Sequence, residues 1–335
     1  MLRVIRQSKL FTDELISRPH PSTPDAFSET CARIAVFGWS SGEPLTQSSN
    51  LSKRLDFAAA GIFRYIPTMG ESPPIVLTIA GFDPSSGAGA TADIKTIAAH
   101  GCYGVSAITA LTVQSGLGVR RVAPVDPKFL TDSLEELTRD VKVSGVHIGM
   151  LGSGGVAEAV AGFLERANPA NVVLDPVLSS SSGRSLVDQR GVTVLIERIM
   201  PLADLVTPNL DEAGLLTGLA VANLEQMKLA AERLREMGAK AVVVTGGHLD
   251  CAIDVLASEA GVQTFRADLL ESSNTHGTGC AFSTAVACQL ALGRSFEMAV
   301  LLAKAYVLLA IRHSYPIGRG AGPLNHFYGR RDSKS

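Results

Sequence analysis

Several features that mark particular protein classes are scarce in this sequence. The chain of 335 residues has one tryptophan and five cysteines, and aromatic residues make up 5%. The cysteines show no paired spacing of the kind that binds zinc, and their odd number, without a secretion signal, favours a reducing compartment. They are Cys31, Cys102, Cys251, Cys280 and Cys288. We therefore expect a cytoplasmic protein with no disulfide and no structural metal.

Excess charge and long apolar runs are also lacking. The 30 Lys and Arg residues nearly balance 32 Asp and Glu residues, for a formal net charge of −2. Nucleic-acid binding normally needs a concentrated basic surface, so we expect no nucleic-acid partner. The most apolar stretch, residues 298–311, contains Lys304 and is too short to span a bilayer. We therefore expect no membrane partner.

The apolar content is high enough for a large core, but it is not spread evenly. Hydrophobic residues make up 46% of the chain and charged residues 19%. Residues 1–72 show no sustained helical or strand period, and residues 64–74 resemble a linker. We interpret 1–72 as a poorly ordered extension, with Met69 as an alternative start, or else as a small helical lobe. Residues 73–330 are then a single domain.

From Ile75 onward, apolar strand-like runs alternate with helical patterns. Buried parallel strands are apolar throughout, whereas surface helices carry an apolar stripe. The predicted strands are 75–80, 103–113, 143–149, 171–175, 203–207 and 240–245, with a hairpin over 252–267. The predicted helices are 90–100, 128–140, 156–166, 224–237, 280–292 and 296–313. This pattern predicts an α/β fold with a central, mostly parallel sheet and helices on both faces, whose ligands bind beyond the carboxyl ends of the strands.

The first loop after a strand, Gly81–Asp93, is rich in glycine. Its residues 87–92 fit a G-x-G-x-x-A dinucleotide fingerprint, which leaves an NAD(P) oxidoreductase as one alternative. The fingerprint needs an acidic residue at the end of the second strand, where Gln114-Ser115-Gly116 stands instead. We therefore expect a loop that lets backbone approach a small ligand, with Asp83 and Asp93 as side-chain contacts. Asp93 alternatively favours only the start of its helix.

A second loop, Asn274–Cys280, precedes a long apolar helix. Gly277-Thr278-Gly279 leaves unpaired backbone N–H groups at the helix N-terminus, which is the geometry of an anion site. Cys280 stands in the same positive potential, which predicts a lowered thiol pKa and a role as nucleophile or general base. The alternative is that Cys280 is a small packing residue. His276 is interpreted as a turn residue.

Polar residues follow three further predicted strands. Asp175 ends one strand, Asn209 and Glu212 lie one helical turn apart after another, and Thr245-Gly-Gly-His248 follows a third. Oxygen ligands of this kind suit Mg²⁺, and together with an anion site they indicate phosphoryl transfer. Asn209 could instead cap a helix, and the glycines could simply form a turn. A regulator that binds a ligand without chemistry is a further alternative.

These motifs resemble the ribokinase-like superfamily, and within it the hydroxymethylpyrimidine/phosphomethylpyrimidine kinases of thiamine biosynthesis. The resemblance is carried by TIAGFDPSSGAGATADIKT (78–96), YGVSAITALTVQS (103–115), IGML (148–151), LDPV (174–177), TPNLDEA (207–213), GGH (246–248), NTHGTGC (274–280) and GRGAGPLNH (318–326). It implies a homodimer that uses ATP and Mg²⁺ to phosphorylate 4-amino-5-hydroxymethyl-2-methylpyrimidine and then its monophosphate. Pyridoxal kinase, which shares this scaffold and the GTGC ending, is the alternative within the superfamily.

The resemblance also implies roles for individual residues. Cys280 would be the catalytic base, and the backbone of Gly277, Thr278 and Gly279 would hold the transferred phosphoryl group. The pyrimidine would be bound by Gln114, with Gly81, Asp93, Met150 and Val177 lining its pocket. Asp175, Asn209, Thr245 and Gly247 would contact ATP phosphates, with Asp175 and Glu212 as Mg²⁺ ligands. Thr245 stands where the family usually has lysine.

Overall fold

The structure is a computed structural model that describes residues 72–180, 183–247 and 251–329. All of them belong to one compact unit, Ser49–Ser335. The predicted N-terminal extension, apart from its last residue, and the alternative start at Met69 lie outside the described residues. Their interpretation therefore stays a prediction.

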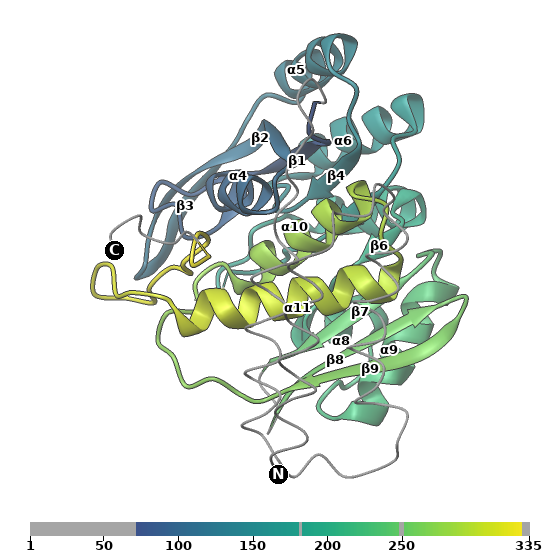
Figure 1. The fold of residues 1–335 in the computed structure, drawn as a ribbon. Coiled ribbons are helices and arrows are strands. Elements are labelled where there is room, and N and C mark those ends of the chain that lie inside the picture. Colours follow the sequence, from purple (N-terminus) through teal and green to yellow (C-terminus); the bar gives the residue numbers. More distant parts are fainter. Residues whose placement is uncertain (1–71, 181–182, 248–250, 330–335) are drawn as a thin grey trace, which may run out of the picture. The chain divides into compact units, whose positions relative to one another are not determined.

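A nine-stranded sheet with the order β3-β2-β1-β4-β5-β6-β7-β8-β9 forms the centre of the fold (Figure 1). The strands from β2 to β7 run parallel in this order, while β3 is antiparallel to β2 and β8 and β9 are antiparallel to their neighbours. The bounds are β1 Ile75–Phe82, β2 Tyr103–Ser115, β3 Gly118–Pro124, β4 Gly145–Ile148, β5 Val172–Leu174, β6 Leu205–Val206, β7 Val242–Gly246, β8 Ala252–Ser258 and β9 Gly261–Ala267.

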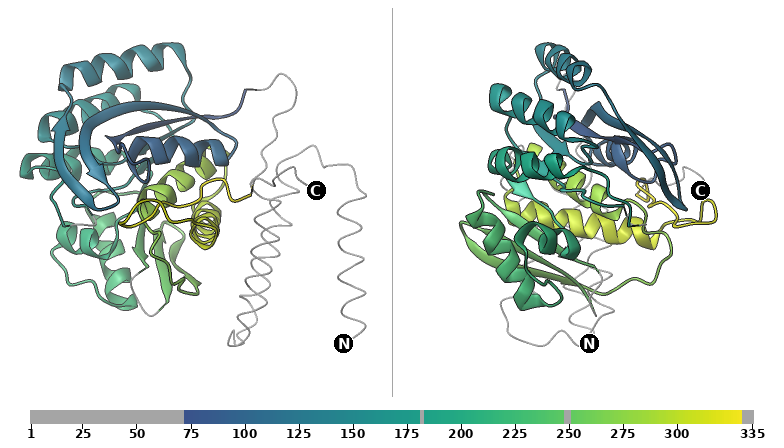
Figure 2. Two further views of the ribbon diagram at one scale, coloured as in Figure 1. Left: turned by 90° about the vertical axis from the view of Figure 1, so that its left-hand side faces the viewer. Right: turned by 180° about the vertical axis from the view of Figure 1, so that it is seen from behind.

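Helices cover both faces of this sheet, as the two further views show (Figure 2). One face carries α4 (Gly89–Ala99), α10 (Thr278–Ala291) and α11 (Phe296–Arg312). Helix α10 packs on both α4 and α11. The other carries α5 (Pro127–Asp140), α6 (Gly154–Ala167), α7 (Gln189–Val194), α8 (Leu210–Thr217) and α9 (Leu224–Glu236). A π-helical turn, Leu195–Ile199, and a 3-10 turn, Met200–Leu202, follow α7 directly.

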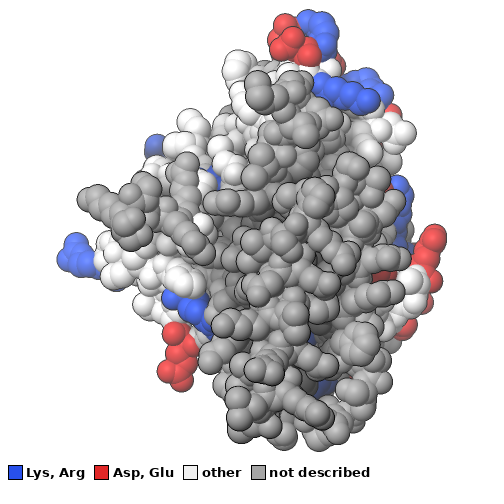
Figure 3. Space-filling model, viewed as in Figure 1, with Lys and Arg blue, Asp and Glu red and all other residues white. Residues whose placement is uncertain are grey.

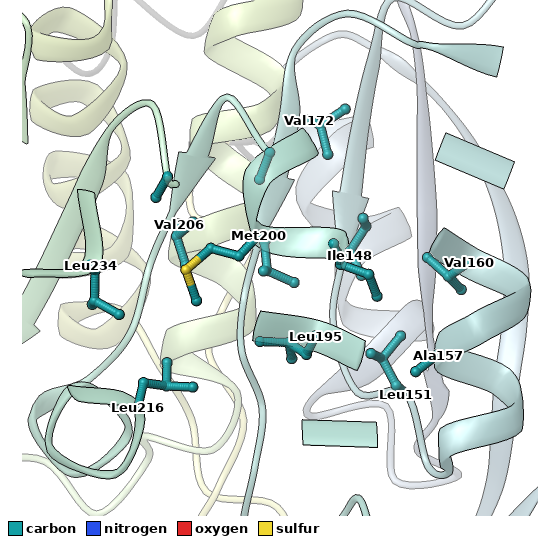
Figure 4. Packing of buried hydrophobic residues seen from close by; sticks show 14 of the residues in the cluster. Ile148, Leu151, Ala157, Val160, Val172, Leu195, Met200, Val206, Leu216 and Leu234 are labelled. Atoms are coloured by element: carbon teal, nitrogen blue, oxygen red, sulfur yellow. The ribbon is translucent and has the colours of Figure 1, made fainter. Parts of the chain in front are cut away.

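The strands are apolar because each buries side chains on both faces. Successive strand residues point to opposite sides, so Val172 and Leu174 enter one core and Val173 the other. In the first core, Ile148 of β4 and Val172 of β5 gather with Ala157 and Val160 of α6 (Figure 4). This double burial explains the near-continuous apolar runs in the sequence.

The predicted fold class is confirmed, and the sheet order locates its ligand-binding edge. From β1 the chain crosses through α4 on one face to β2, and from β4 it crosses through α6 on the other face to β5. Loops diverge between β1 and β4, which makes this the switch point where such sheets bind ligands. The hairpin over 252–267 is confirmed as β8 and β9. Strand β3 and helix α8 were not among the predicted elements.

The described surface mixes both signs of charge. Lys and Arg side chains alternate with Asp and Glu side chains around the visible rim of the face in Figure 3. Among the described helices, none combines the length and apolarity that crossing a membrane requires.

Candidate phosphoryl-transfer site

His276 connects the first loop to the segment before α10. Its Nε2 lies 2.9 Å from Asp83 Oδ2 and 3.3 Å from the amide nitrogen of Gln114. A carboxylate only accepts, so Nε2 donates to Asp83. The interpretation of His276 as a turn residue was incomplete, because its partner lies 193 residues away in the sequence. The position of His276 beside the predicted anion loop was the only signal that could have suggested this role.

Asp83 organises the first loop rather than offering a free carboxylate. Its side chain accepts hydrogen bonds from the backbone N–H groups of Ser85 at 2.8 Å and Ala88 at 3.0 Å, in addition to His276. Burial favours the neutral acid, but these hydrogen bonds outweigh it and lower the pKa of Asp83. The expected side-chain contact with a ligand is thus replaced by contacts within the protein.

Two glycines let the first loop touch the start of α10. Gly277 has φ +81°, and a Cβ added there would lie 1.9 Å from the carbonyl oxygen of Gly87. A Cβ on Gly87 would in turn lie 2.1 Å from the His276 ring. Only residues without a Cβ allow this approach, which explains the glycines of both motifs.

Gly277→Ala is therefore expected to displace the two loops and lower kcat/KM about a hundredfold, since displacements near 1 Å have effects of that size. Gly293→Ala is the matched control. Gly293 has a similar φ of +79°, but a Cβ there meets nothing within 4 Å. The control should lose about 1 kcal/mol of stability at unchanged kcat/KM. Equal activity in the two variants, measured with the same protein preparation and substrates, would contradict the loop contact.

The first turn of α10 has the geometry of an anion site. Gly277 caps the helix without a side-chain hydrogen bond, and Gly279 is exposed. The Thr278 hydroxyl donates to the carbonyl oxygen of Thr275 at 2.7 Å, and the Thr278 backbone N–H donates to the same oxygen at 3.3 Å. The first-turn N–H groups of a helix point outward along its axis and bind phosphate well. The structure thus brings together the predicted anion-binding residues Gly277, Thr278 and Gly279.

Cys280 lies next to the Asp175 carboxylate, and its pKa moves opposite to the prediction. The thiol hydrogen bonds to Asp175 and accepts from the backbone N–H of Gly89. Burial raises the pKa of Cys280 well above its usual value, and the negative charges of Asp175, Asp93 and Glu212 add to this effect. The helix N-terminus favours the thiolate, but burial and three carboxylates outweigh it. The predicted lowering of the thiol pKa was therefore wrong.

The residues predicted to line the pyrimidine pocket are only partly brought together. Val177 packs against the small apolar cluster that contains Met150, and a Cβ added at Gly81 would lie 2.7 Å from Met150 Cε. Gln114 lies on β2, where its Oε1 accepts from the Thr112 hydroxyl at 3.1 Å. These contacts place Gly81, at the end of β1, in one group with Met150 and Val177, which follow β4 and β5.

Asp93 is set apart from this group. It is completely buried, and its two carboxylate oxygens accept from the hydroxyls of Thr284 at 2.9 Å and Thr78 at 2.7 Å. A wall of the substrate pocket would need an accessible atom, so the expected lining role has no support in the observed placement of Asp93. Its carboxylate instead contacts His147, which the sequence analysis did not single out.

Asn209 and Glu212 form a capping box at the start of α8. The Asn209 side chain accepts from the Glu212 N–H at 2.9 Å, and the Glu212 carboxylate accepts from the Asn209 N–H at 3.0 Å. The capping alternative for Asn209 is thus correct. Thr245 donates its N–H to the carbonyl oxygen of Pro208 at 2.9 Å, which holds it beside Asn209, and Gly247 is exposed.

Asp175 and Glu212 are buried carboxylates that suit a cation. Burial raises the pKa of Asp175 to about 6 and that of Glu212 to about 8, and the charge of Asp175 contributes to the second value. In the described part of the chain, His, Cys, Asp and Glu side chains form no group of three or more that could hold a metal ion. Mg²⁺ commonly uses one or two carboxylates and takes its other ligands from phosphates and water, so this pair fits it.

Glu212→Gln is expected to flatten the decline of stability with pH. The pKa of Glu212 is about 8 in the folded protein against an ordinary value of 4.5, so the folded protein binds an extra proton between these two pH values. Stability from this group is complete below pH 4.5 and is lost as pH rises to 8. At pH 8 without Mg²⁺, the variant should melt at a higher temperature than the wild-type chain.

The measurement is a series of thermal unfolding curves from pH 5 to pH 8. Glu259→Gln, which removes an exposed carboxylate between β8 and β9, is the control and should keep the wild-type slope. A Glu212→Gln slope equal to that of wild type would contradict the buried, proton-binding carboxylate.

The comparisons with known proteins agree with this geometry. A family model described as phosphomethylpyrimidine kinase matches residues 83–325. The chain is 40% identical over 258 residues to the hydroxymethylpyrimidine/phosphomethylpyrimidine kinase of Haemophilus influenzae, covering 75% of this chain and 96% of the relative. It is 43% identical over 259 residues to the thiamine biosynthesis bifunctional protein ThiED of Geobacter sulfurreducens, covering 77% of this chain but only 53%, about half, of that relative.

Solved structures show the same fold. The phosphomethylpyrimidine kinase of Clostridium difficile is 37% identical, with a TM-score of 0.64, covering 71% of this chain and 99% of that one. The Bacillus subtilis pyridoxal kinase, solved as an ADP complex, is 32% identical with a TM-score of 0.70, covering 76% of this chain and 98% of that one. The NAD(P) oxidoreductase alternative finds no support in these matches. The chain belongs to the phosphomethylpyrimidine kinase family and has its ribokinase-like fold.

Proposed function

We propose that this protein transfers the γ-phosphoryl group of ATP to 4-amino-5-hydroxymethyl-2-methylpyrimidine and then to the resulting monophosphate, in thiamine diphosphate biosynthesis. One observation carries the proposal beyond family membership. The uncapped N-terminus of α10 presents Cys280 beside the Asp175 carboxylate, at the carboxyl edge of the sheet. Positioning and neutralisation of charge are what phosphoryl transfer requires of a protein.

Different site residues are assigned to the transferred phosphoryl group, to Mg²⁺ and to the nucleotide phosphates. The N–H groups of Gly277 and Gly279 stabilise the charge on the transferred group. The N–H of Thr278 points to the same place only if it leaves the carbonyl oxygen of Thr275, to which it donates at 3.3 Å. Mg²⁺, held by Asp175 and Glu212, would neutralise phosphate charge. Asn209, Thr245 and Gly247 border the nucleotide phosphates, although the Asn209 side chain itself is engaged as a helix cap.

Cys280 receives the proton of the substrate hydroxyl as the new P–O bond forms and the bond to the ADP leaving group breaks. Since its pKa is raised, the thiol is protonated in the free protein at neutral pH. It can act as a base only after its own proton has moved away. The hydrogen-bonded Asp175 carboxylate, whose pKa of about 6 leaves it ionised at neutral pH, is the acceptor that we assign to this proton.

Pyridoxal is the second candidate substrate. Its support is the likeness to pyridoxal kinases, including one from Staphylococcus aureus whose structure with AMP-PCP and pyridoxal has a TM-score of 0.70 at 32% identity. Gly81, Met150 and Val177 form an apolar group at the carboxyl edge of the sheet, which suits either flat ring. Gln114 supplies an amide that can hydrogen bond to the pyrimidine nitrogens.

ATP consumption with separate acceptors tests the proposal. The full chain with Mg²⁺ is supplied with hydroxymethylpyrimidine, its monophosphate or pyridoxal, and kcat/KM is measured for each. We expect the highest value for the pyrimidine and measurable turnover of its monophosphate. A higher kcat/KM for pyridoxal would replace the proposed substrate, and no turnover of any of the three would reject the proposal.

The family resemblance also supports a homodimer in the cytoplasm. Sedimentation velocity of the purified chain should give twice the mass of 35.1 kDa. A monomer at micromolar concentration would contradict this part of the proposal.

A further inference from the structure

Four buried polar side chains, in successive contact with one another, lie next to the proposed site. Asp93 on α4, His147 on β4, Ser283 on α10 and Asp175 after β5 are each at most 5% exposed. His147 Nδ1 lies 3.3 Å from Asp93 Oδ2, and its Nε2 lies 2.9 Å from Ser283 Oγ. The Ser283 hydroxyl in turn lies 3.2 Å from Asp175 Oδ2. These four side chains therefore connect the buried side of α4 to the carboxylate that contacts Cys280.

The protons of the His147 ring and of the Ser283 hydroxyl can be assigned from the chemistry of their contacts. Asp93 accepts only, so the contact from Nδ1 requires a proton on that nitrogen. Ser283 has one proton and several acceptors within reach, which are Asp175 at 3.2 Å and the carbonyl oxygens of Gly279 and Cys280 at 3.1 Å. If His147 Nε2 lacked a proton, it would compete for that of Ser283. A protonated Nε2 donates to Ser283 and leaves the hydroxyl proton for Asp175 or the helix carbonyls.

The surrounding charges favour this doubly protonated ring. Asp93 faces His147 from α4, and Asp175 faces it from the end of β5. From α10 the titratable groups are the thiols of Cys280 and Cys288, and β1 contributes the uncharged Thr78. Burial works against protonation, but the charge and hydrogen bond of Asp93 and the charge of Asp175 outweigh it. The pKa of His147 is therefore raised.

We propose that His147 is a positioning residue for phosphoryl transfer. Its ring, held by Asp93, donates to Ser283 and directs the Ser283 hydroxyl toward Asp175, so that this carboxylate keeps its place beside Cys280. The importance of that placement rests on the proposed function. The assignment of the proton to Nε2 does not, and it can be tested in the free protein.

The first test is NMR of the full chain labelled with ¹⁵N-histidine, without ligands. The His147 signals are assigned by their loss in His147→Gln. At pH 7 both ring nitrogens of His147 are expected to carry protons. A ring whose Nε2 is unprotonated at pH 7 would overturn the proposal, whatever the substrate proves to be.

The second test compares two neutral replacements of matched chemistry. The amide nitrogen of His147→Gln can reach the position of Nε2 and donate to Ser283, whereas that of His147→Asn reaches only the position of Nδ1. Both variants lose the positive charge next to Asp93. We expect His147→Asn to lower kcat about 10- to 100-fold, as replacement of supporting hydrogen-bond partners commonly does, and His147→Gln to recover most of it at similar KM.

Ser283→Ala separates positioning from packing. If His147 acts through Ser283, then adding His147→Asn to Ser283→Ala lowers kcat no further, so the two effects are not additive. Equal loss in the Gln and Asn variants, or additive losses in the double variant, would overturn the positioning role. Full activity of Asp175→Asn would also overturn the positioning role, because the transfer would then not need the carboxylate that His147 is proposed to hold in place.

Discussion

Cys280→Ala is expected to lower kcat for pyrimidine phosphorylation about 10²- to 10⁴-fold, the range that a positioned acid or base supplies. The thiol lies at the N-terminus of α10 and hydrogen bonds to Asp175, so its removal takes away the group nearest the proposed transfer. ATP binding should be largely unchanged, because the backbone N–H groups of the first turn remain. Steady-state kinetics and calorimetric titration with ATP measure the two quantities separately.

Cys251→Ala is the matched control for this substitution. Cys251 is also partly buried, it directly precedes β8, and it packs against the core that contains the buried residues of α9. Its replacement should leave kcat within about twofold, as expected for a substitution remote from the reacting atoms. Wild-type turnover by Cys280→Ala would remove Cys280 from the mechanism.

The raised pKa of Cys280 has a direct chemical consequence. Only the thiolate is alkylated by iodoacetamide, so modification of Cys280 should be slow at pH 7 and should increase steadily toward pH 9 and above. Peptide mapping after timed alkylation identifies the residue. Fast alkylation at pH 7 with a plateau below pH 8 would restore the lowered pKa that the sequence suggested.

The sequence was sufficient for most of the fold because burial on both faces leaves a visible pattern. Runs such as 76–79 and 241–244 are mostly apolar since their side chains enter two cores in alternation, for example Val242 and Val244 the first and Val243 the second. Strand β3 (Gly118–Pro124) lacks that pattern. Its central Arg120 and Arg121 are exposed at the sheet edge, and it is a strand only because it pairs with β2. Pairing with a neighbouring strand of this kind cannot be predicted from the local amino-acid composition.

The edge of the sheet where the candidate site lies could be predicted from the sequence, but the direction of the pKa shift of Cys280 could not. Asp175 and Glu212 follow the parallel strands β5 and β6, whose carboxyl ends share one edge of the sheet, and the charges of both act on Cys280 at the start of α10. The effect of the helix N-terminus on Cys280 was visible in the sequence, whereas burial and the nearby carboxylates were not. His147 and Ser283 were missed for a related reason. Their hydrogen bond joins residues 136 positions apart, and each alone looks like an ordinary core residue.

Lys304→Met is expected to destabilise the protein by about 3–5 kcal/mol, the usual effect of breaking one partner from a buried ion pair. Lys304 Nζ on α11 lies 2.7 Å from Asp254 Oδ2 on β8, and each side chain is 9% exposed. Methionine fills a similar volume, so the loss measures the Asp254 charge that is left without a partner rather than a cavity. Urea unfolding monitored by circular dichroism gives the free energy.

The double variant Lys304→Met/Asp254→Asn tests this explanation. It removes both charges while keeping an oxygen at residue 254 that can accept from the N–H of Gly246, now 3.4 Å from Asp254 Oδ1. Removal of both members of a buried pair is often close to neutral, so most of the lost stability should return. If the double variant is as unstable as Lys304→Met, then packing of the lysine stem is responsible.

Because Gly246 ends β7 next to Thr245, the same variants show whether this ion pair also supports ATP binding. A weaker affinity in Lys304→Met that the double variant restores would link the two.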